Sequence, residues 1–377
     1  MTPYRFQAST RVVGGRGLLG SEPGRRAPLT EEVARLGGRR LVLVTDRGVR
    51  SAGLLEPVVS ALGDLVVEVF DGCVPNAEAS TVAVLADRIR AVRGDGVVAL
   101  GGGSVMDTAK AAAMLVTLGG DSILEHLSAR LSGPLHLRLA CIPTTAGTGS
   151  EVSIGAVIKD ADRGMKVPLG SQYLAPDLAL LVPELTVGLP GPLTAATGFD
   201  ALTHAIEAYL SPRANPFTDA LALDAVRRIV HWLPEAMDRP DDLTAREQML
   251  AAAAMAAQAF NSAQLGACHA VAHALGGLYD VPHGVANALM LPAVMAFNEE
   301  ACRVRWPALT LALGGADPVA LVTALRARLR LPERLSQVGV TAVGAELIAA
   351  AMSDPFMRLN PRPVREADVA SWLEAVR

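Results

Sequence analysis

The sequence predicts an α/β domain built on a parallel sheet, followed by an all-helical domain. Three observations carry this prediction. Short apolar runs alternate with helical patterns in the first half, almost no strand pattern follows Pro190, and 377 residues exceed what one hydrophobic core usually serves. Because the change falls in the Gly- and Pro-rich turn at 188–192, we place the domains at residues 1–188 and 189–377.

In the first domain, each strand is expected as a short apolar run rich in β-branched residues. Such runs lie at 41–44, 65–70, 96–100 and 138–142, with two further candidates at 156–158 and 178–182. Helical patterns at 51–62 and 78–92 separate the first three strands. Strands that alternate with helices form βαβ units, so we expect a parallel sheet.

The second domain is rich in Ala and Leu, which favour helices. Apolar residues recur at helical spacing in three stretches, 203–210, 220–233 and 243–259. Proline removes a backbone donor and interrupts helices. We therefore expect breaks at five prolines, Pro216, Pro234, Pro240, Pro282 and Pro307.

Composition narrows the classes of partner. The net charge is −4 without a long basic run, which argues against nucleic acid and against an anionic membrane surface. The N-terminus lacks the apolar core of a signal peptide, and we find no apolar stretch of about 18 residues that would span a membrane. The four cysteines form no CxxC pair, which favours a reducing compartment. We expect a cytoplasmic protein.

Two turns follow strands and resemble ligand-binding loops. The strand at 96–100 runs into Gly101-Gly102-Gly103-Ser104 and then a helical pattern, where glycines and free helix N–H groups suit a phosphate. The turn at 143–151 holds hydroxyls and glycines that suit phosphate or ribose oxygens. Both could instead be structural, as a Gly-rich α/β turn and a Ser/Thr loop that caps its own backbone. Two such turns at strand ends favour nucleotide binding.

Asp46 lies just past the strand at 41–44. An acid there accepts hydrogen bonds from the adenosine ribose and repels a 2′-phosphate, which favours NAD over NADP. The neighbouring Arg47 would suit that phosphate, and an Asp that stabilises the Asp-Arg-Gly turn explains the residue equally well.

Histidines and one aspartate have the spacing of metal ligands. Asp200 and His204 are four residues apart, as are His269 and His273, so each pair shares one helix face. His283 follows a proline and enters from a helix start or a turn. Carboxylate and imidazole together suit iron or zinc. Spacing offers five ligands for the usual four positions and does not identify the spare one.

Four segments, in the same order, resemble the iron-containing (group III) alcohol dehydrogenases: 101–110, 143–151, 198–208 and 269–287. The resemblance extends from about residue 40 to Asn360. It implies a Rossmann-like domain followed by a helical one, the architecture of iron alcohol dehydrogenases and of dehydroquinate synthase. It also implies a homodimer that exchanges a hydride between NAD(H), or NADP(H), and a small alcohol or aldehyde, with Fe2+ or Zn2+ as Lewis acid.

The resemblance also implies roles for single residues. His273 becomes the residue spared by the metal, a catalytic proton relay near the nicotinamide. The implied metal ligands are Asp200, His204, His269 and His283. The implied cofactor contacts are Asp46, Asn76, Gly102, Gly103, Ser104, Thr144, Thr145, Thr148 and Lys166.

Three positions depart from the family pattern. Val182 replaces a common Asp, Ser153 replaces a frequent Thr, and the small residues before Asn360 become the bulkier run at 356–359. If that run lines the substrate pocket, Arg358 would suit an anionic aldehyde through its fork of donors; otherwise it is an exposed loop residue.

Three rival functions remain at this stage. A maleylacetate-reductase-like enzyme would transfer a hydride on the same scaffold without needing the metal. A dehydroquinate-synthase-like enzyme would use NAD transiently in a cyclisation. A non-catalytic NAD- or metal-binding protein would keep the cluster without turnover. The intact Asp200, His204, His269 and His283 set favours the metal-dependent alcohol dehydrogenase.

Overall fold

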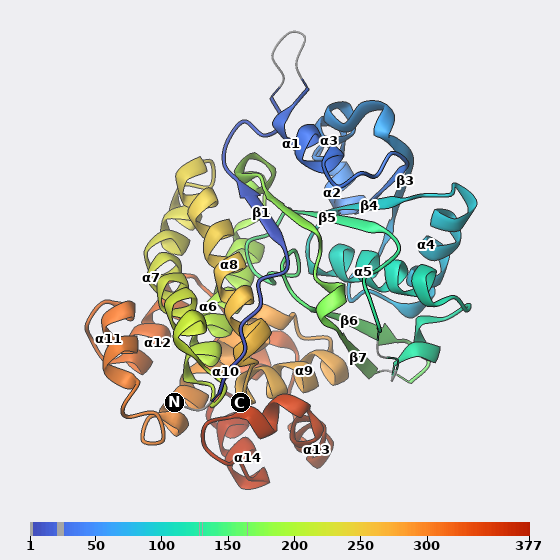
Figure 1. Cartoon of the computed structure of the whole chain (residues 1–377). Coiled ribbons are helices and arrows are strands. Elements are labelled where there is room, and N and C mark those ends of the chain that lie inside the picture. The colour runs from blue at the N-terminus through green and yellow to red at the C-terminus, as the bar shows by residue number, and fades with distance from the viewer. Residues whose placement is uncertain (1–2, 21–25, 128, 130, 164) are drawn as a thin grey trace. The chain divides into compact units, whose positions relative to one another are not determined.

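The computed structural model describes residues 3–20, 26–127, 129, 131–163 and 165–377 (Figure 1). The chain forms two compact units. One comprises residues 8–145 and 150–188, and the other comprises residues 3–7, 146–149 and 189–377. A parallel-sheet unit and a helical unit confirm the predicted fold class.

The first unit is built on a six-stranded parallel sheet in the order β1-β8-β5-β4-β2-β3. Its strands are β1 (Arg11–Gly14), β2 (Leu41–Asp46), β3 (Val66–Cys73), β4 (Gly96–Gly101), β5 (Arg138–Pro143) and β8 (Leu178–Leu181). A separate antiparallel pair comprises β6 (Gly155–Asp160) and β7 (Met165–Gly170). Strands β1 and β7 were not predicted from the sequence.

Helices cover both faces of the sheet, so its central strands are buried on both sides. They are α1 (Pro28–Ala34), α2 (Arg47–Ser51), α3 (Leu55–Leu62), α4 (Ala79–Ala91) and α5 (Gly103–Leu118). Val42 and Val97 pack in one core with α4 and α5. Leu43 and Val98, the next residues along the same strands, pack in the other core with α1 and α3. This alternation explains why β2 and β4 are continuous apolar runs.

The second unit contains only helices among its described residues. They are α6 (Gly191–Leu210), α7 (Pro216–Asp238), α8 (Leu243–Ala263), α9 (Ala267–Tyr279), α10 (His283–Asn298), α11 (Trp306–Leu313), α12 (Pro318–Arg328), α13 (Ala345–Ser353) and α14 (Glu366–Ala375). Helix α6 is buried along most of its length, with small residues such as Ala201 and Ala205 at its contacts. It begins at Gly191, well before the predicted 203, because Pro192 occupies its first turn.

Proline marks helix boundaries at most of the predicted positions. Pro216 and Pro307 lie in the first turns of α7 and α11, and Pro282 is the N-cap of α10. The predicted break at Pro234 was wrong, because α7 continues through this residue to Asp238. Pro234 is buried near the end of a 23-residue helix, where packing of the apolar face outweighs the lost backbone bond.

By length and composition, the stretch Trp306–Arg328 could cross a membrane, so the prediction that no apolar stretch reaches this length was wrong. The structure divides the stretch into the short helices α11 and α12. Gly314 and Gly315 between them have φ values of +112° and +94°, which end the first helix. Asp317 then caps the second helix, because its side chain accepts a hydrogen bond from the Ala320 N–H.

Candidate metal centre and cofactor-binding edge

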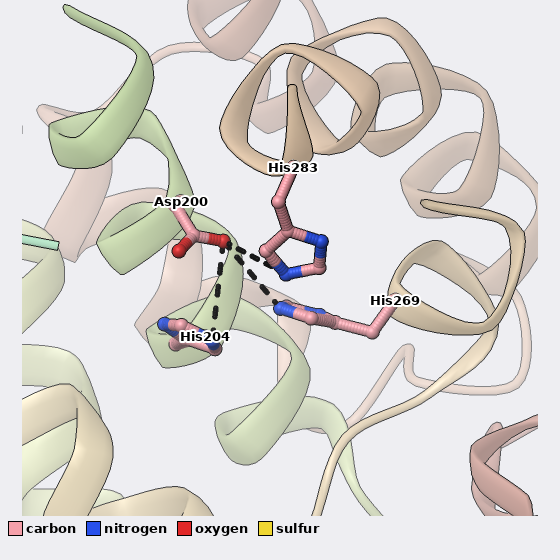
Figure 2. A group of neighbouring side chains, drawn as sticks. All are labelled: Asp200, His204, His269 and His283. Atoms are coloured by element: carbon pink, nitrogen blue, oxygen red, sulfur yellow. Dashed lines mark ion pairs between the residues drawn. The ribbon is translucent and has the colours of Figure 1, made fainter. Parts of the chain in front are cut away.

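Three helices bring the four predicted metal ligands together (Figure 2). Asp200 and His204 lie one turn apart on the buried helix α6. His269 comes from α9, and His283 is the first residue of α10, directly after the N-cap proline. The side chains point toward one another, with ion-pair lines converging on the Asp200 carboxylate.

The spacing of the ligand atoms fits one small divalent cation. All four donor atoms lie within 4.8 Å of one another. Asp200 Oδ1 is 3.9 Å from His204 Nε2, 3.7 Å from His269 Nε2 and 3.5 Å from His283 Nε2. Tetrahedral ligands at about 2.1 Å from a metal would be about 3.4 Å apart. One carboxylate and three imidazoles are a donor set that suits iron or zinc.

Glu207 orients His269, one of the four candidate metal ligands, through the ring nitrogen that does not face the cluster. Its Oε2 lies 2.6 Å from His269 Nδ1, which places the hydrogen on Nδ1 and leaves Nε2 for a metal. Its Oε1 accepts a hydrogen bond of 2.8 Å from the Cys268 N–H. A side chain at Gly266 would approach Glu207 Oε1 to 2.9 Å, so glycine leaves room for this carboxylate.

Asn287 contacts three of the ligands from α10. Its Nδ2 donates to Asp200 Oδ1 at 2.7 Å and lies 3.2 Å from His269 Nε2 and 3.3 Å from His283 Nε2. Asn287 is fully buried, one turn after His283. The amide therefore orients the Asp200 carboxylate within the cluster.

Burial and mutual charge set the protonation of the cluster. Burial lowers the pKa of His204 to about 4, which keeps this imidazole neutral and free to bind a metal. Burial alone would raise the pKa of Asp200, but the neighbouring histidines outweigh it and hold that pKa well below its usual range. Burial opposes protonation of His269, whereas hydrogen bonds to Asp200 and Glu207 raise its pKa to about 9.

The fifth histidine has a different partner. His273 Nδ1 lies 2.8 Å from Asp354 Oδ2. The His273 ring stacks on His283, with centroids 5.3 Å apart and planes 17° apart. It also lies 5.8 Å from the ring of Phe356. The structure therefore places His273 beside the cluster but outside its four donors.

The bulky run before Asn360 forms a short helix, η6 (Pro355–Leu359). Asp354 caps it, and Phe356 faces His273, so this run does lie beside the histidines. Arg358 is exposed. Asn360 is buried, and its side-chain oxygen accepts from the Asn298 amide at 2.9 Å.

The predicted cofactor residues of the first unit gather at one edge of the sheet. Strands β5, β4, β2 and β3 are consecutive neighbours, so their carboxyl ends lie side by side. Asp46 ends β2. Gly102 is the N-cap of α5, after β4, and Thr144 follows β5. The other predicted residues at this edge are Asn76, Gly103, Ser104 and Thr145.

Details at this edge suit a phosphate-bearing ligand. Ser104 Oγ accepts a hydrogen bond from the Asn76 N–H at 3.1 Å, which joins the segments after β3 and β4. A side chain at Gly102 would stand 3.5 Å from Thr145 Oγ1, so the two turns touch. Thr145 Oγ1 is buried and has no hydrogen-bond partner among the described residues. A buried hydroxyl without a protein partner is a candidate hydrogen-bonding group for a bound ligand.

Asp46 lies at this edge but its carboxylate has a structural partner, whereas Lys166 and Thr148 lie elsewhere. Asp46 Oδ1 accepts from the Val49 N–H at 2.8 Å, so this carboxylate caps α2, the structural alternative stated above. Lys166 lies on β7, opposite Lys159, whose N–H donates to Ala77 O beside the segment after β3. Thr148 belongs to the helical unit, so the structure does not group it with Thr144 and Thr145.

Three functional candidates escaped the sequence analysis: Glu207, Asn287 and Asp354. Glu207 had a signal, because positions 200, 204 and 207 share one face of a helix. Asn287 had the same signal, four residues after His283. Asp354 had none, because 81 residues separate it from His273.

Comparison with known proteins gives matches to both units. Residues 19–183 match the family described as iron-containing alcohol dehydrogenase, and residues 194–376 match the C-terminal part of the Fe-containing alcohol dehydrogenase family. The chain is 41% identical over 348 residues to the probable alcohol dehydrogenase EutG of Salmonella typhimurium, which covers 90% of this chain and 88% of the relative.

Two solved structures are similar along the whole chain. A 1,3-propanediol oxidoreductase superposes with a TM-score of 0.93 at 33% identity and covers 100% of both chains. Sulfoacetaldehyde reductase from Bifidobacterium kashiwanohense, in complex with NAD+, has a TM-score of 0.90 at 28% identity and covers 100% of this chain and 99% of its own.

Proposed function

The chain belongs to the iron-containing alcohol dehydrogenases, oxidoreductases that act on CH–OH groups, and from this premise we propose that it transfers a hydride between NAD(H) and a short-chain alcohol or aldehyde. The observation that carries the proposal is the cluster of one carboxylate and three imidazoles at ligand spacing, of which all but His283 are buried. A maleylacetate-reductase-like enzyme would not require this donor set, so the cluster favours the metal-dependent enzyme.

The metal would be held by Asp200, His204, His269 and His283, and the donor set suits Fe2+ and, as the second choice, Zn2+. When bound, such an ion supplies a Lewis acid that polarises the substrate oxygen. Around it, Glu207 and Asn287 hold the ligands in orientation.

The chain's own residues supply the remaining steps. In alcohol oxidation, the carbon-bound hydrogen leaves with both electrons of its bond to reduce the nicotinamide, and the hydroxyl proton leaves separately. His273 is the side chain that we assign to this proton, because it lies beside the cluster and remains one-quarter exposed. Aldehyde reduction is the reverse, with the proton returned to the product oxygen.

For the cofactor, we assign the pyrophosphate to Gly102, Gly103 and Ser104 at the start of α5. We assign further contacts with the cofactor to Asn76, Thr144, Thr145, Thr148 and Lys166. Asp46 favours NAD(H) over NADP(H), because its carboxylate would repel a 2′-phosphate. Support for NAD also comes from the similar sulfoacetaldehyde reductase, whose structure contains NAD+.

An anionic aldehyde is the finer substrate proposal. The run at 356–359 is bulkier than the family pattern, lies within η6 beside His273 and carries the exposed Arg358. A guanidinium binds carboxylate or sulfonate oxygens through paired donors. One of the similar proteins is a sulfoacetaldehyde reductase, and sulfoacetaldehyde is an anionic aldehyde.

The remaining assignments concern the molecule and its surroundings. We assign the cofactor to residues 1–188 and the metal to residues 189–377. The four cysteines are buried and free, which favours the reducing cytoplasm. A net charge of −4 gives no support for nucleic acid or an anionic membrane as a partner. We propose that the protein forms a homodimer, on the basis of the family resemblance.

The test is a turnover assay with iron-loaded protein, prepared without oxygen, against neutral and anionic short aldehydes. We expect oxidation of NADH to exceed that of NADPH, and loss of turnover in a chelated sample or in Asp200→Asn. The matched control is Asp238→Asn, an exposed carboxylate at the end of α7, which should retain activity. Iron-loaded protein that binds NADH but reduces none of the aldehydes would overturn the proposal, and equal rates after chelation would overturn the metal's role.

A further inference from the structure

We propose that Asp354 is a positioning residue that fixes the tautomer of His273 and so keeps His273 Nε2 free to exchange the substrate proton. This inference rests on the proposed function, since the proton in question is that of the alcohol. Asp354 is the N-cap of η6, directly before the helix that contains the bulky run, and it lies 81 residues from His273 in sequence.

The two oxygens of Asp354 have separate partners. Oδ2 lies 2.8 Å from His273 Nδ1, and Oδ1 accepts from the Phe356 N–H, also at 2.8 Å. An ionised carboxylate only accepts hydrogen bonds, so the hydrogen of a neutral His273 must be on Nδ1. The lone pair then lies on Nε2, the nitrogen that can take up a proton.

The surroundings of His273 fit this assignment. Its ring stacks on His283 and lies edge-on to His269, with centroids 6.2 Å apart, so it borders the metal cluster without belonging to it. Its side chain is 25% exposed, against 1% for His269 and 14% for Asp354. The imidazole can therefore be reached by substrate or water, while the carboxylate behind it is mostly shielded.

The same carboxylate joins two parts of the helical unit. By capping η6 it holds the run at 355–359, and by binding His273 it ties this run to α9. The position of Phe356 and the orientation of His273 thus depend on one side chain. A change in the run's sequence that moves Asp354 would alter both the position of Phe356 and the proton relay.

Asp354→Asn keeps a side chain of the same size at position 354 but changes the hydrogen bond that it makes to His273. The variant therefore tests whether the carboxylate sets the tautomer of His273. The amide has one accepting oxygen, so it can keep the cap on Phe356 only by turning its NH2 toward His273 Nδ1. His273 must then accept at Nδ1 and carry its hydrogen on Nε2, the wrong tautomer for taking a proton. We expect kcat of the iron-loaded enzyme to fall about 100-fold, with KM for NADH and the melting temperature close to wild type.

A double-mutant comparison tests whether Asp354 acts through His273. In a His273→Gln background, Asp354→Asn should cause no further loss of kcat. Asp317→Asn is the matched control, because Asp317 caps α12 in the same way without a histidine partner, and its kcat should not change. Equal losses of kcat from Asp354→Asn in both backgrounds would overturn the proposal.

A second measurement does not depend on turnover and so separates this inference from the proposed function. In zinc-loaded protein with 15N-labelled histidine, the His273 signals, assigned with His273→Gln, report the tautomer. We expect Nδ1–H in the wild type and Nε2–H in Asp354→Asn. Wild-type protein with hydrogen on Nε2 would overturn the inference, whichever reaction the enzyme catalyses.

Discussion

Glu207 is the residue whose effect on metal binding can be isolated most cleanly. Its hydrogen-bond partners among the described residues are His269 Nδ1, the His269 N–H and the Cys268 N–H, none of which is a donor atom of the cluster. Glu207→Gln keeps an oxygen for one of these bonds and loses the charge. We expect the metal dissociation constant to rise about 10- to 100-fold, measured by competition with a chromogenic chelator.

The control for this variant is Glu235→Gln, which alters a half-buried carboxylate on α7 in the same unit, paired with the C-cap residue Arg239. Its metal affinity should equal that of the wild type. An unchanged dissociation constant in Glu207→Gln would mean that the His269 ring is held by packing alone.

Thr145 offers a residue-scale test of the cofactor edge. Its hydroxyl is buried without a partner among the described residues, so Thr145→Val should leave the free energy of unfolding unchanged or raise it. The dissociation constant for NADH should rise about fivefold, because about 1 kcal/mol of hydrogen bonding to the ligand is lost. Tryptophan-to-NADH energy transfer or calorimetry measures the binding.

Thr117→Val is the counterpart on the same sheet unit. The Thr117 hydroxyl donates to Ala113 O and accepts from the His136 N–H, so this variant should lose stability and keep its NADH affinity. Tight NADH binding by Thr145→Val would remove Thr145 from the cofactor contacts.

At this scale, the sequence predicted those residues whose partners lie one helical turn away. The spacing of Asp200 and His204 brought them to one face, and the structure places both in the cluster. Spacing did not separate His273 from the four residues whose donor atoms cluster, because His269 and His273 also share a face. That distinction depends on Asp354, a contact between distant segments that no local pattern encodes.

At the scale of the element, Lys110 and Asp107 of α5 hold the segment that follows the second turn. Lys110 Nζ, fully buried, donates to Ser153 Oγ at 2.9 Å and to two backbone carbonyls of the same segment. Asp107 accepts from Ser150 Oγ and from the Val157 N–H. The Ser153 hydroxyl thus serves structure, which accounts for a hydroxyl residue at this departure from the family pattern.

Glu151, in the turn at 143–151, makes the free energy of unfolding depend on pH. Burial raises the pKa of Glu151 from 4.5 to about 7, so the folded state holds a proton that the unfolded chain releases. Its contribution to stability is complete below pH 4.5 and is lost as pH rises through about 7. Glu151→Gln should therefore gain up to about 3 kcal/mol over the wild type between pH 4.5 and pH 8, measured by urea unfolding.

Glu56→Gln, on the exposed face of α3, serves as the control, and its difference from the wild type should not vary over this pH range. A difference between Glu151→Gln and wild type that is constant with pH would mean that Glu151 is ionised in the folded state.

The segment 146–149 belongs to the helical unit through a close contact with α8. Gly149 has a φ of +63°, and a side chain there would stand 2.1 Å from the Ala257 Cβ. Gly149→Ala should lower the free energy of unfolding by about 3 kcal/mol, from backbone strain and overpacking together. Gly339→Ala has a similar φ of +82° with open space around it, so it should cost only about 1 kcal/mol. Equal losses in urea unfolding would contradict the contact with α8.

Among the elements, the sequence predicted those with strong periodicity and missed those without it. The central strands are buried on both faces and read as apolar runs. Strand β1 has four residues, lies at an edge and is largely exposed, so its sequence carries little apolar signal. Strand β7 contains Pro168 and, among the described residues, pairs with β6 alone, and a proline in a short polar run argues against a strand.

For the molecule as a whole, metal binding should stabilise the unit that holds the cluster. All three tryptophans, Trp232, Trp306 and Trp372, lie in the helical unit, so their fluorescence reports its unfolding. At a metal concentration of about 100 times the dissociation constant, we expect a gain of about 2.7 kcal/mol. Asp200→Asn should abolish the gain, and an equal gain in this variant would place the ion elsewhere.

The pairing of β1 with β8 determines when the sheet can be completed during synthesis of the chain. Arg11 is opposite Leu178, and within the described part of the chain β1 pairs with no other strand. The first strand to leave the ribosome must therefore wait for the last one, while the strands between them can already pair with one another. Nascent chains in which β8 has not yet been synthesised leave the edge of β5 unpaired. Another chain could add a strand at this edge. Residues 3–7 wait longer still, because they pack with helices that are synthesised after the sheet.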